Sequence, residues 1–172
     1  MVNDINDSHK IQTRMMTITQ RRRIAWILIL IADIGLLAWG AMAALIPQQL
    51  LGPGSRPILP AGYEGYTNYS WSELVSMFPK ASDYITLLFR LFGVSNITFA
   101  IMAIAITVTA FRRGERWAWW TLLIGNTIAY GAPMTYDRIV NAIGPFEMLE
   151  YVGVAVIYIA LAITAPFNTK KN

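Results

Sequence analysis

Residues Tyr84 to Tyr136 read YITLLFRLFGVSNITFAIMAIAITVTAFRRGERWAWWTLLIGNTIAYGAPMTY, two apolar runs separated by a short basic turn. The 21 residues from Leu91 to Phe111 carry no charge. At about 1.5 Å of rise per residue they are long enough to cross a bilayer core of about 30 Å. The turn Arg112-Arg113-Gly114-Glu115-Arg116 leaves room only for a tight reversal, and its three arginines resist translocation. The pattern therefore predicts a transmembrane helical hairpin whose turn lies in the cytoplasm.

The composition is that of a membrane protein. Of 172 residues, 55% are hydrophobic and only 14% are charged, whereas about a quarter of a soluble domain is charged. The net charge of +4 comes from basic residues that flank apolar runs, so we interpret them as topology signals and expect no nucleic-acid partner. The chain has no cysteine, and His9 is its one histidine. These absences argue against disulfides, thiol chemistry and the usual redox-metal ligands, so we expect no metal and no cofactor.

Two further apolar runs complete the predicted fold, which is all-α: an integral membrane four-helix bundle. The run Ile24 to Ile46 follows three arginines and, at 23 residues, is longer than the apolar region of a signal peptide. The predicted helices span about 24–46, 84–111, 117–136 and 146–167 and make up a transmembrane domain of residues 21–167. Residues 1–20 and 168–172 are expected to be polar cytoplasmic tails.

The long connection between the first two helices, residues 47–83, is predicted to lie outside the cytoplasm. Its glycines and prolines are expected to break any regular structure before Tyr66. Ser70 and Glu73 then fit a capping box, which predicts a short helix from Trp71 to Phe78. Its apolar residues fall at i, i+3, i+4 and i+7, so this helix is expected to be amphipathic and to lie on the membrane surface or cap the bundle.

The distribution of basic residues predicts the orientation. Ten lysines and arginines lie in the tails, before the first helix and in the turn, against four on the opposite side. By the positive-inside rule, the sequence predicts a multi-pass protein of the cell membrane with both termini in the cytoplasm.

Charged residues within predicted spans are costly and are candidates for function. Asp33 lies near the middle of the first helix, where it would serve either as a proton or cation site or as an interhelical hydrogen-bonding group. Arg90 lies near the outer end of the second helix, where it either extends to the headgroups or forms a polar face with Gly93 and Asn96. At Gly93 another helix can approach closely. We expect Arg90 to face the bundle interior and to pair with Glu150 first and with Asp33 second.

The third and fourth helices offer further polar groups. Asn126 and Tyr130 share one face of the third helix. On the fourth, one polar and aromatic stripe enters from the outer side and contains Glu147, Glu150, Tyr151, Val154 and Tyr158, unless Glu147 and Glu150 are ordinary interfacial residues. A four-helix bundle could bring these groups into one internal pocket open to the extracytoplasmic side. The predicted polar cluster, ligand-binding or structural, consists of Asp33, Arg90, Asn96, Asn126, Tyr130 and Glu150.

Several short segments resemble a known group of proteins. Trp71-Ser72-Glu73-Leu74, Arg90-Leu91-Phe92-Gly93 and the aromatic sequence after the Arg112–Arg116 turn are similar to small, uncharacterised prokaryotic membrane proteins with four spans that are DoxX-like. The resemblance covers about residues 66–125 and implies a four-helix bundle with no assigned reaction. Some DoxX-like proteins are associated with thiol-redox systems, and the absence of cysteine argues against that role here.

The sequence contains no nucleophilic triad, phosphate-binding loop or metal-ligand cluster. The leading hypothesis is therefore a non-enzymatic integral membrane protein that serves as an accessory or stabilising subunit of a membrane complex. Its expected partners are the lipid bilayer and either another membrane protein or further copies of itself. The alternative hypothesis is a small-molecule or ion binding and transport protein that uses the intramembrane polar pocket.

Overall fold

The computed structural model describes residues 18–52, 56–141 and 144–166, without the side chains of residues 145–147. Within these residues the fold is all-helical, as predicted, and has no β-strand beyond one isolated bridge between Leu51 and Pro57. The elements in chain order are α2 (Ile18–Leu45), the 3-10 turn η1 (Pro47–Gln49), α3 (Ile58–Thr67), α4 (Trp71–Met77), α5 (Pro79–Ile106), the π-helical segment η3 (Thr107–Phe111), α6 (Arg116–Ile139) and α7 (Pro145–Ile163).

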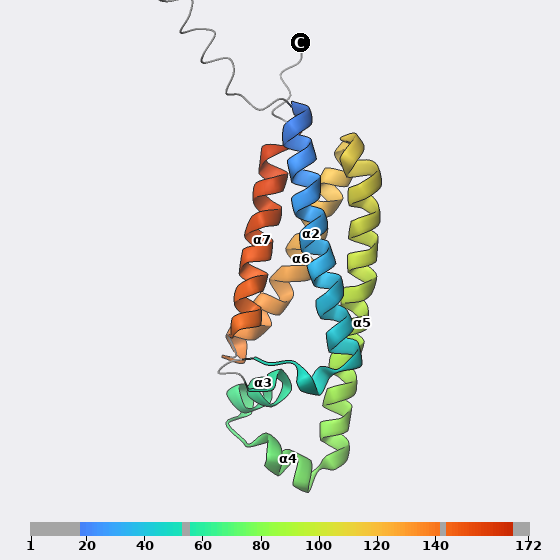
Figure 1. Cartoon of the computed structure of the whole chain (residues 1–172). Coiled ribbons are helices and arrows are strands. Elements are labelled where there is room, and N and C mark those ends of the chain that lie inside the picture. The colour runs from blue at the N-terminus through green and yellow to red at the C-terminus, as the bar shows by residue number, and fades with distance from the viewer. Residues whose placement is uncertain (1–17, 53–55, 142–143, 167–172) are drawn as a thin grey trace, which may run out of the picture.

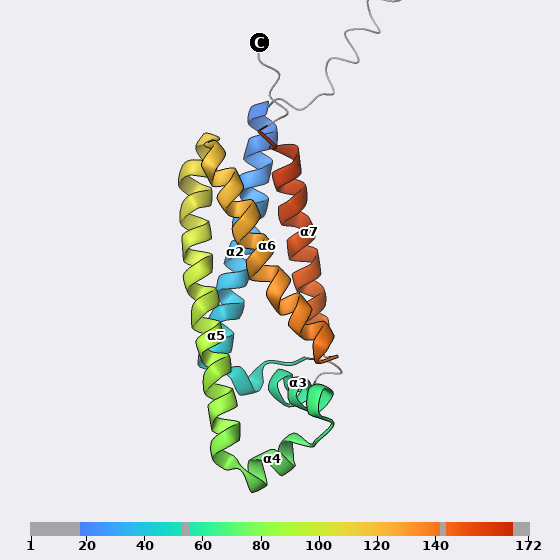
Figure 2. The same ribbon diagram turned by 180° about the vertical axis from the view of Figure 1, so that it is seen from behind.

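Four helices run along the long axis of the molecule, and two short ones gather at one end (Figure 1). We call this end, which holds α3 and α4, the α3–α4 end. The opposite end holds the turn between η3 and α6 and is called the arginine end. Helix α5 extends past the C-terminus of α2 to reach α4, and α6 leans from α5 at the arginine end toward α7 at the α3–α4 end (Figures 1 and 2).

Two of these helices are long and apolar enough to cross a membrane: Ile18–Leu45, with 28 residues, and the continuous α5–η3 helix Pro79–Phe111, with 33. The predicted reversal follows the second of them. The turn closes with a hydrogen bond from the Gly114 N–H to the Phe111 carbonyl, 2.9 Å long. Gly114 has a φ of 83°, a left-handed conformation that glycine adopts without the cost of a β-carbon.

The core lies at the arginine end, where all four long helices meet. Small residues let the backbones approach: Ala25, Ala110, Ala118 and Ala160 are fully or almost fully buried. Larger side chains fill the spaces between them, among them Ile29, Phe111, Leu122, Ile157 and Leu161. This mixture of small and large residues is the packing expected between helices whose association depends on close contact.

The expectation that glycines and prolines prevent regular structure before Tyr66 is wrong, because Ile58–Thr67 forms helix α3. Pro60 is the third residue of α3, in the first turn, where the backbone N–H has no intrahelical partner to lose. Gly65 lies against the loop after α6, since a β-carbon there would be 2.1 Å from the Val140 carbonyl oxygen. The helix ends at Asn68, which has a φ of 60° and donates its N–H to the Glu64 carbonyl.

The predicted capping box and short helix are confirmed. Ser70 caps α4, with its hydroxyl accepting from the Ser72 N–H at 3.2 Å, and its own N–H donates to the Glu73 carboxylate at 3.3 Å. Glu64 of α3 connects the two short helices, because its carboxylate accepts a hydrogen bond from the Trp71 N–H at the start of α4. The same carboxylate forms an ion pair with Arg56.

Four predicted helix limits differ from the structure by three or more residues. The second long helix starts at Pro79 instead of residue 84, because proline is well suited to the first helical position. Helix α2 starts at Ile18 and therefore includes the end of the predicted tail 1–20. Helix α6 continues to Ile139 rather than 136. Helix α7 ends at Ile163, three residues before Pro166, which disfavours helical backbone at the residue preceding it. Residues 1–17 and 168–172, predicted as tails, lie outside the described residues.

Candidate functional site

A buried polar pair lies between the two longest helices. Asp33 of α2 is fully buried, and its Oδ2 accepts a hydrogen bond of 3.3 Å from the Thr107 hydroxyl. Thr107 is the first residue of the π-helical segment η3 and is also fully buried. Such segments recur at functional sites, because one widened turn changes the direction of its side chains. Within the described part of the chain, Asp33 Oδ1 has no hydrogen-bond partner.

The buried asparagines mainly bond within their own helices. The side-chain amide of Asn96 donates to the Phe92 carbonyl at 3.1 Å, and that of Asn126 donates to the Leu122 carbonyl at 2.8 Å. Tyr130, one turn after Asn126, is buried and lies within electrostatic reach of both Asp33 and Glu150. Among the six predicted cluster residues, Tyr130 therefore lies near both Asp33 and Glu150.

Arg90 does not occupy the predicted position, and the expectation that it faces the interior and pairs with an acid is wrong. Its side chain is exposed, and its Nη1 lies 3.5 Å from the carbonyl oxygen of Ala44. Ala44 belongs to the last turn of α2, where carbonyl groups lack helical partners and carry partial negative charge. Because α5 continues beyond the end of α2, Arg90 reaches this helix terminus instead of the bundle centre.

Gly93, one turn further along α5, is the expected point of close approach. A β-carbon on Gly93 would lie 2.5 Å from the Ala44 backbone nitrogen and 2.8 Å from the Gly40 carbonyl oxygen. In the same way, a β-carbon on Gly40 would lie 3.0 Å from the Gly93 carbonyl oxygen. The two helices thus touch backbone to backbone, in the manner of small-residue contacts between membrane helices.

A cavity of about 770 Å³ lies toward the α3–α4 end, surrounded by α2, α3, α5, α6 and α7. Its wall is mainly apolar and aromatic, and Trp39 packs edge-on against Phe89 and Phe92 with ring centroids 6.1 and 5.6 Å apart. Asp137 and Glu150 are the two acids that line it, and no basic side chain is among its described lining residues. Glu150 is the one member of the predicted cluster that lines this cavity.

The space arises from the course of α6. Pro133 lies inside α6 and lines the cavity. A proline in a helix interior removes one helical hydrogen bond and favours a bend. Helix α6 leans away from α5 toward the α3–α4 end (Figure 2), so α3 closes a space that no long helix fills.

The aromatic wall contributed by α3 was not anticipated from the sequence. Leu59, Gly62, Tyr63 and Tyr66 all line the cavity and fall at i, i+3, i+4 and i+7. This helical spacing was a usable signal, but the density of glycine and proline was interpreted as preventing a helix.

Comparison of the chain with protein-family models, with curated proteins and with solved structures found no match. The resemblance to DoxX-like proteins therefore stays a prediction.

Proposed function

We propose that the protein is a four-span membrane protein whose cavity binds a small apolar molecule carrying a positive charge. The observation that carries the proposal is the aromatic cavity with two acids in its wall. Pockets for small molecules typically measure about 300–1,000 Å³ and are mostly apolar with a few polar groups. A volume of about 770 Å³ lies within that range.

The four spans are supported by the outer surfaces of the long helices. Each of them exposes large apolar side chains: Ile31 of α2 is 63% exposed, Leu91 of α5 61%, Ile128 of α6 66% and Ile159 of α7 59%. Such surfaces are expected of helices in contact with lipid. Helices α6 and α7, with 24 and 19 residues, lie beside the two membrane-length helices. With four spans, both ends of the chain are on the same side, and the arginine end is cytoplasmic by the positive-inside rule.

The charge preference follows from the composition of the wall. Aromatic faces attract cations through their negative π surfaces. The wall contains Trp39, Phe89, Tyr63 and Tyr136 among its aromatic residues, together with the carboxyl groups of Asp137 and Glu150. An apolar cation would gain from both kinds of group, whereas an apolar anion of the same shape would be repelled by the acids.

Two probes of matched shape and opposite charge test the proposal: tetraphenylphosphonium and tetraphenylborate. Equilibrium dialysis of the full chain in a neutral detergent, with empty micelles as the blank, gives the amount bound. We expect saturable binding of the cation and weaker binding of the anion. Equal binding of both ions, or binding no greater than that of the micelles, would contradict the proposal.

A pair of variants locates the binding. Glu150→Gln removes a carboxyl group from the cavity wall and is expected to weaken cation binding about tenfold, or about 1.4 kcal/mol. Asp83→Asn removes an exposed acid of α5 that does not line the cavity, and it should leave cation binding unchanged. Equal loss in both variants would indicate a general effect of charge and would exclude the cavity as the site.

The hypothesis of an accessory subunit stays a prediction. Purification of the full chain in mild detergent from its native membrane is its test, and recovery of a stoichiometric membrane-protein partner is the expected result. A strictly monomeric protein without a partner would contradict it.

A further inference from the structure

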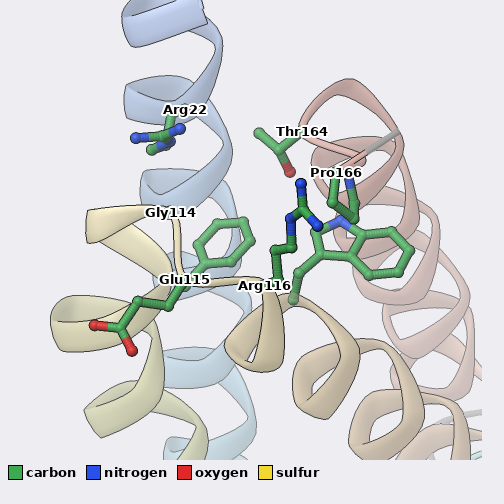
Figure 3. A pocket seen from close by; sticks show the side chains of 8 residues that line it. Arg22, Gly114, Glu115, Arg116, Thr164 and Pro166 are labelled. Atoms are coloured by element: carbon green, nitrogen blue, oxygen red, sulfur yellow. The ribbon is translucent and has the colours of Figure 1, made fainter. Parts of the chain in front are cut away.

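A second pocket lies at the arginine end, remote from the cavity. Its volume is about 240 Å³, and its walls come from the start of α2, the turn before α6, the first residues of α6 and the residues after α7. Figure 3 shows Arg22 on one side of this pocket and Arg116, Thr164 and Pro166 on the other. Two guanidinium groups from elements far apart in the sequence therefore line one small space.

The acid in this wall is directed elsewhere. The Glu115 carboxylate accepts from the Trp117 indole N–H and from the Arg113 guanidinium, 2.8 Å away. Figure 3 shows its carboxylate pointing away from Arg116. The hydrogen bond from Trp117, and to a smaller extent that from Arg113, lowers the pKa of the Glu115 carboxyl below its usual value. Glu115 therefore stays ionised but does not neutralise the two arginines of the pocket.

Arg22 is held in place by the backbone of the turn. Its Nη1 donates to the Arg113 carbonyl at 3.4 Å. Its guanidinium also lies directly against Gly114, where a β-carbon would be 2.5 Å from the Arg22 Cζ. These contacts position the Arg22 guanidinium without neutralising it, because a carbonyl oxygen carries no full charge, and no described acid forms an ion pair with Arg22.

Arg116 is the more accessible of the two cations. Its side chain is exposed, and within the described residues it has neither an ion pair nor a side-chain hydrogen bond. Its guanidinium points toward Thr164 and Pro166 (Figure 3). The Thr164 hydroxyl donates to the Ala160 carbonyl and the Trp119 indole N–H to the Leu161 carbonyl, both at 2.8 Å. Among the described side chains that line this pocket, the available donors are therefore those of the two arginines.

We propose that this pocket binds a phosphate group, carried either by an anionic lipid headgroup or by a small soluble phosphate ester. Guanidinium groups present paired N–H donors that match phosphate oxygens. One of them neutralises a singly charged phosphate diester, and two neutralise a doubly charged phosphate monoester. The pocket lies where both membrane-length helices, α2 and α5–η3, have their arginine ends. In a bilayer this is the level of the headgroups, where phosphate is the most abundant anion. The proposal is independent of the ligand of the apolar cavity.

The test uses the full chain in two arms. In the first, thermal unfolding is followed in nanodiscs of phosphatidylcholine with increasing fractions of phosphatidylglycerol. In the second, the protein in neutral detergent is titrated with glycerol 1-phosphate. We expect the melting temperature to rise in at least one arm, and we expect Arg116→Gln to lose most of that rise. Arg116 is the decisive position, because its side chain makes no described contact that holds the fold together.

Arg23→Gln is the matched control. Arg23 adjoins Arg22 on α2, is exposed and does not line the pocket, so this variant should keep the rise. A rise in nanodiscs alone assigns the site to a lipid headgroup, and a rise with glycerol 1-phosphate assigns it to a soluble ester. Equal loss in Arg23→Gln and Arg116→Gln would overturn the proposal in favour of general attraction between charges. An unchanged melting temperature in both arms, or an Arg116→Gln protein that behaves like the wild type, would also overturn it.

Discussion

Neighbouring residues of α2 face two different environments. Gly40 lies against the backbone of α5, where Gly93 permits contact closer than any side chain allows, whereas Trp39 lines the cavity. We call the first region, formed by Gly40, Ala43, Ala44 and Gly93, the α2–α5 seam. The same pair of helices thus takes part both in a backbone-to-backbone contact and in the wall of the cavity.

The difference shows how one short segment of helix can serve two purposes. Glycines bring α2 and α5 together at the seam, while α6, which contains Pro133, leans away from α5 on the neighbouring side (Figure 2). A tightly packed interface fixes the relative position of two helices. That fixed position supports the cavity wall without requiring side chains to fill it.

The largest effect is expected from Gly93→Ala. The new methyl group would lie 2.5 Å from the Ala44 backbone nitrogen, so the two helices would have to separate. We expect a loss of about 2–3 kcal/mol in the free energy of unfolding, measured by denaturation in detergent. Gly35→Ala on α2 is the control, since nothing lies within 4 Å of its added β-carbon, and helix propensity favours that change. A Gly93→Ala protein as stable as the Gly35→Ala protein would show that the seam is not tightly packed.

The next effect concerns the polar bond between α2 and η3. Thr107→Val keeps the shape of the side chain but removes the hydroxyl that donates to Asp33. We expect a loss of about 1–3 kcal/mol, because a buried carboxyl group is left without that donor. The double variant with Asp33→Leu should recover part of this loss. If the double variant is less stable than the sum of the single changes predicts, the Asp33–Thr107 bond is not the interaction that was removed.

Replacing alanine by leucine should affect stability differently in the cavity wall and in the packed core. Ala132→Leu places a larger side chain in the cavity wall, and we expect the free energy of unfolding to change by less than about 0.5 kcal/mol. Ala118→Leu makes the same change at a fully buried position of the packed core and should cost about 1–3 kcal/mol. Chemical denaturation of both variants in one detergent gives the comparison, and equal losses would mean that the cavity does not accommodate the added side chain.

The smallest effect is expected at the arginine end, outside both regions. Because the folded protein lowers the pKa of Glu115, this carboxyl contributes stability above its usual pKa and loses that contribution as the pH falls through the folded value. The difference in melting temperature between wild type and Glu115→Gln should therefore be largest near neutral pH and shrink in acid. A difference that grows on acidification would contradict the assignment of the hydrogen bonds from Trp117 and Arg113.

Three local features of the fold follow from local sequence. The uncharged run to Phe111, the turn after it and the capping box at Ser70 depend on neighbours within a few residues, and all three occur in the structure as predicted. The point of close approach at Gly93 was also predictable, because the lack of a side chain is a property of the residue itself. Four spans and their orientation stay predictions from the apolar runs and the distribution of basic residues.

The tertiary structure alone decided which faces meet. Arg90 was expected inside the bundle, but α2 ends beside it and offers a carbonyl oxygen instead of an acid. The glycine and proline content of residues 58–67 predicted no helix, but α3 forms, and Gly65 packs it against the loop after α6. The cavity depends on the lean of α6 toward α7 and on how far α5 extends past the C-terminus of α2 (Figure 2). These quantities arise from contacts between residues distant in sequence, and the periodicity of a single helix carries no information about them.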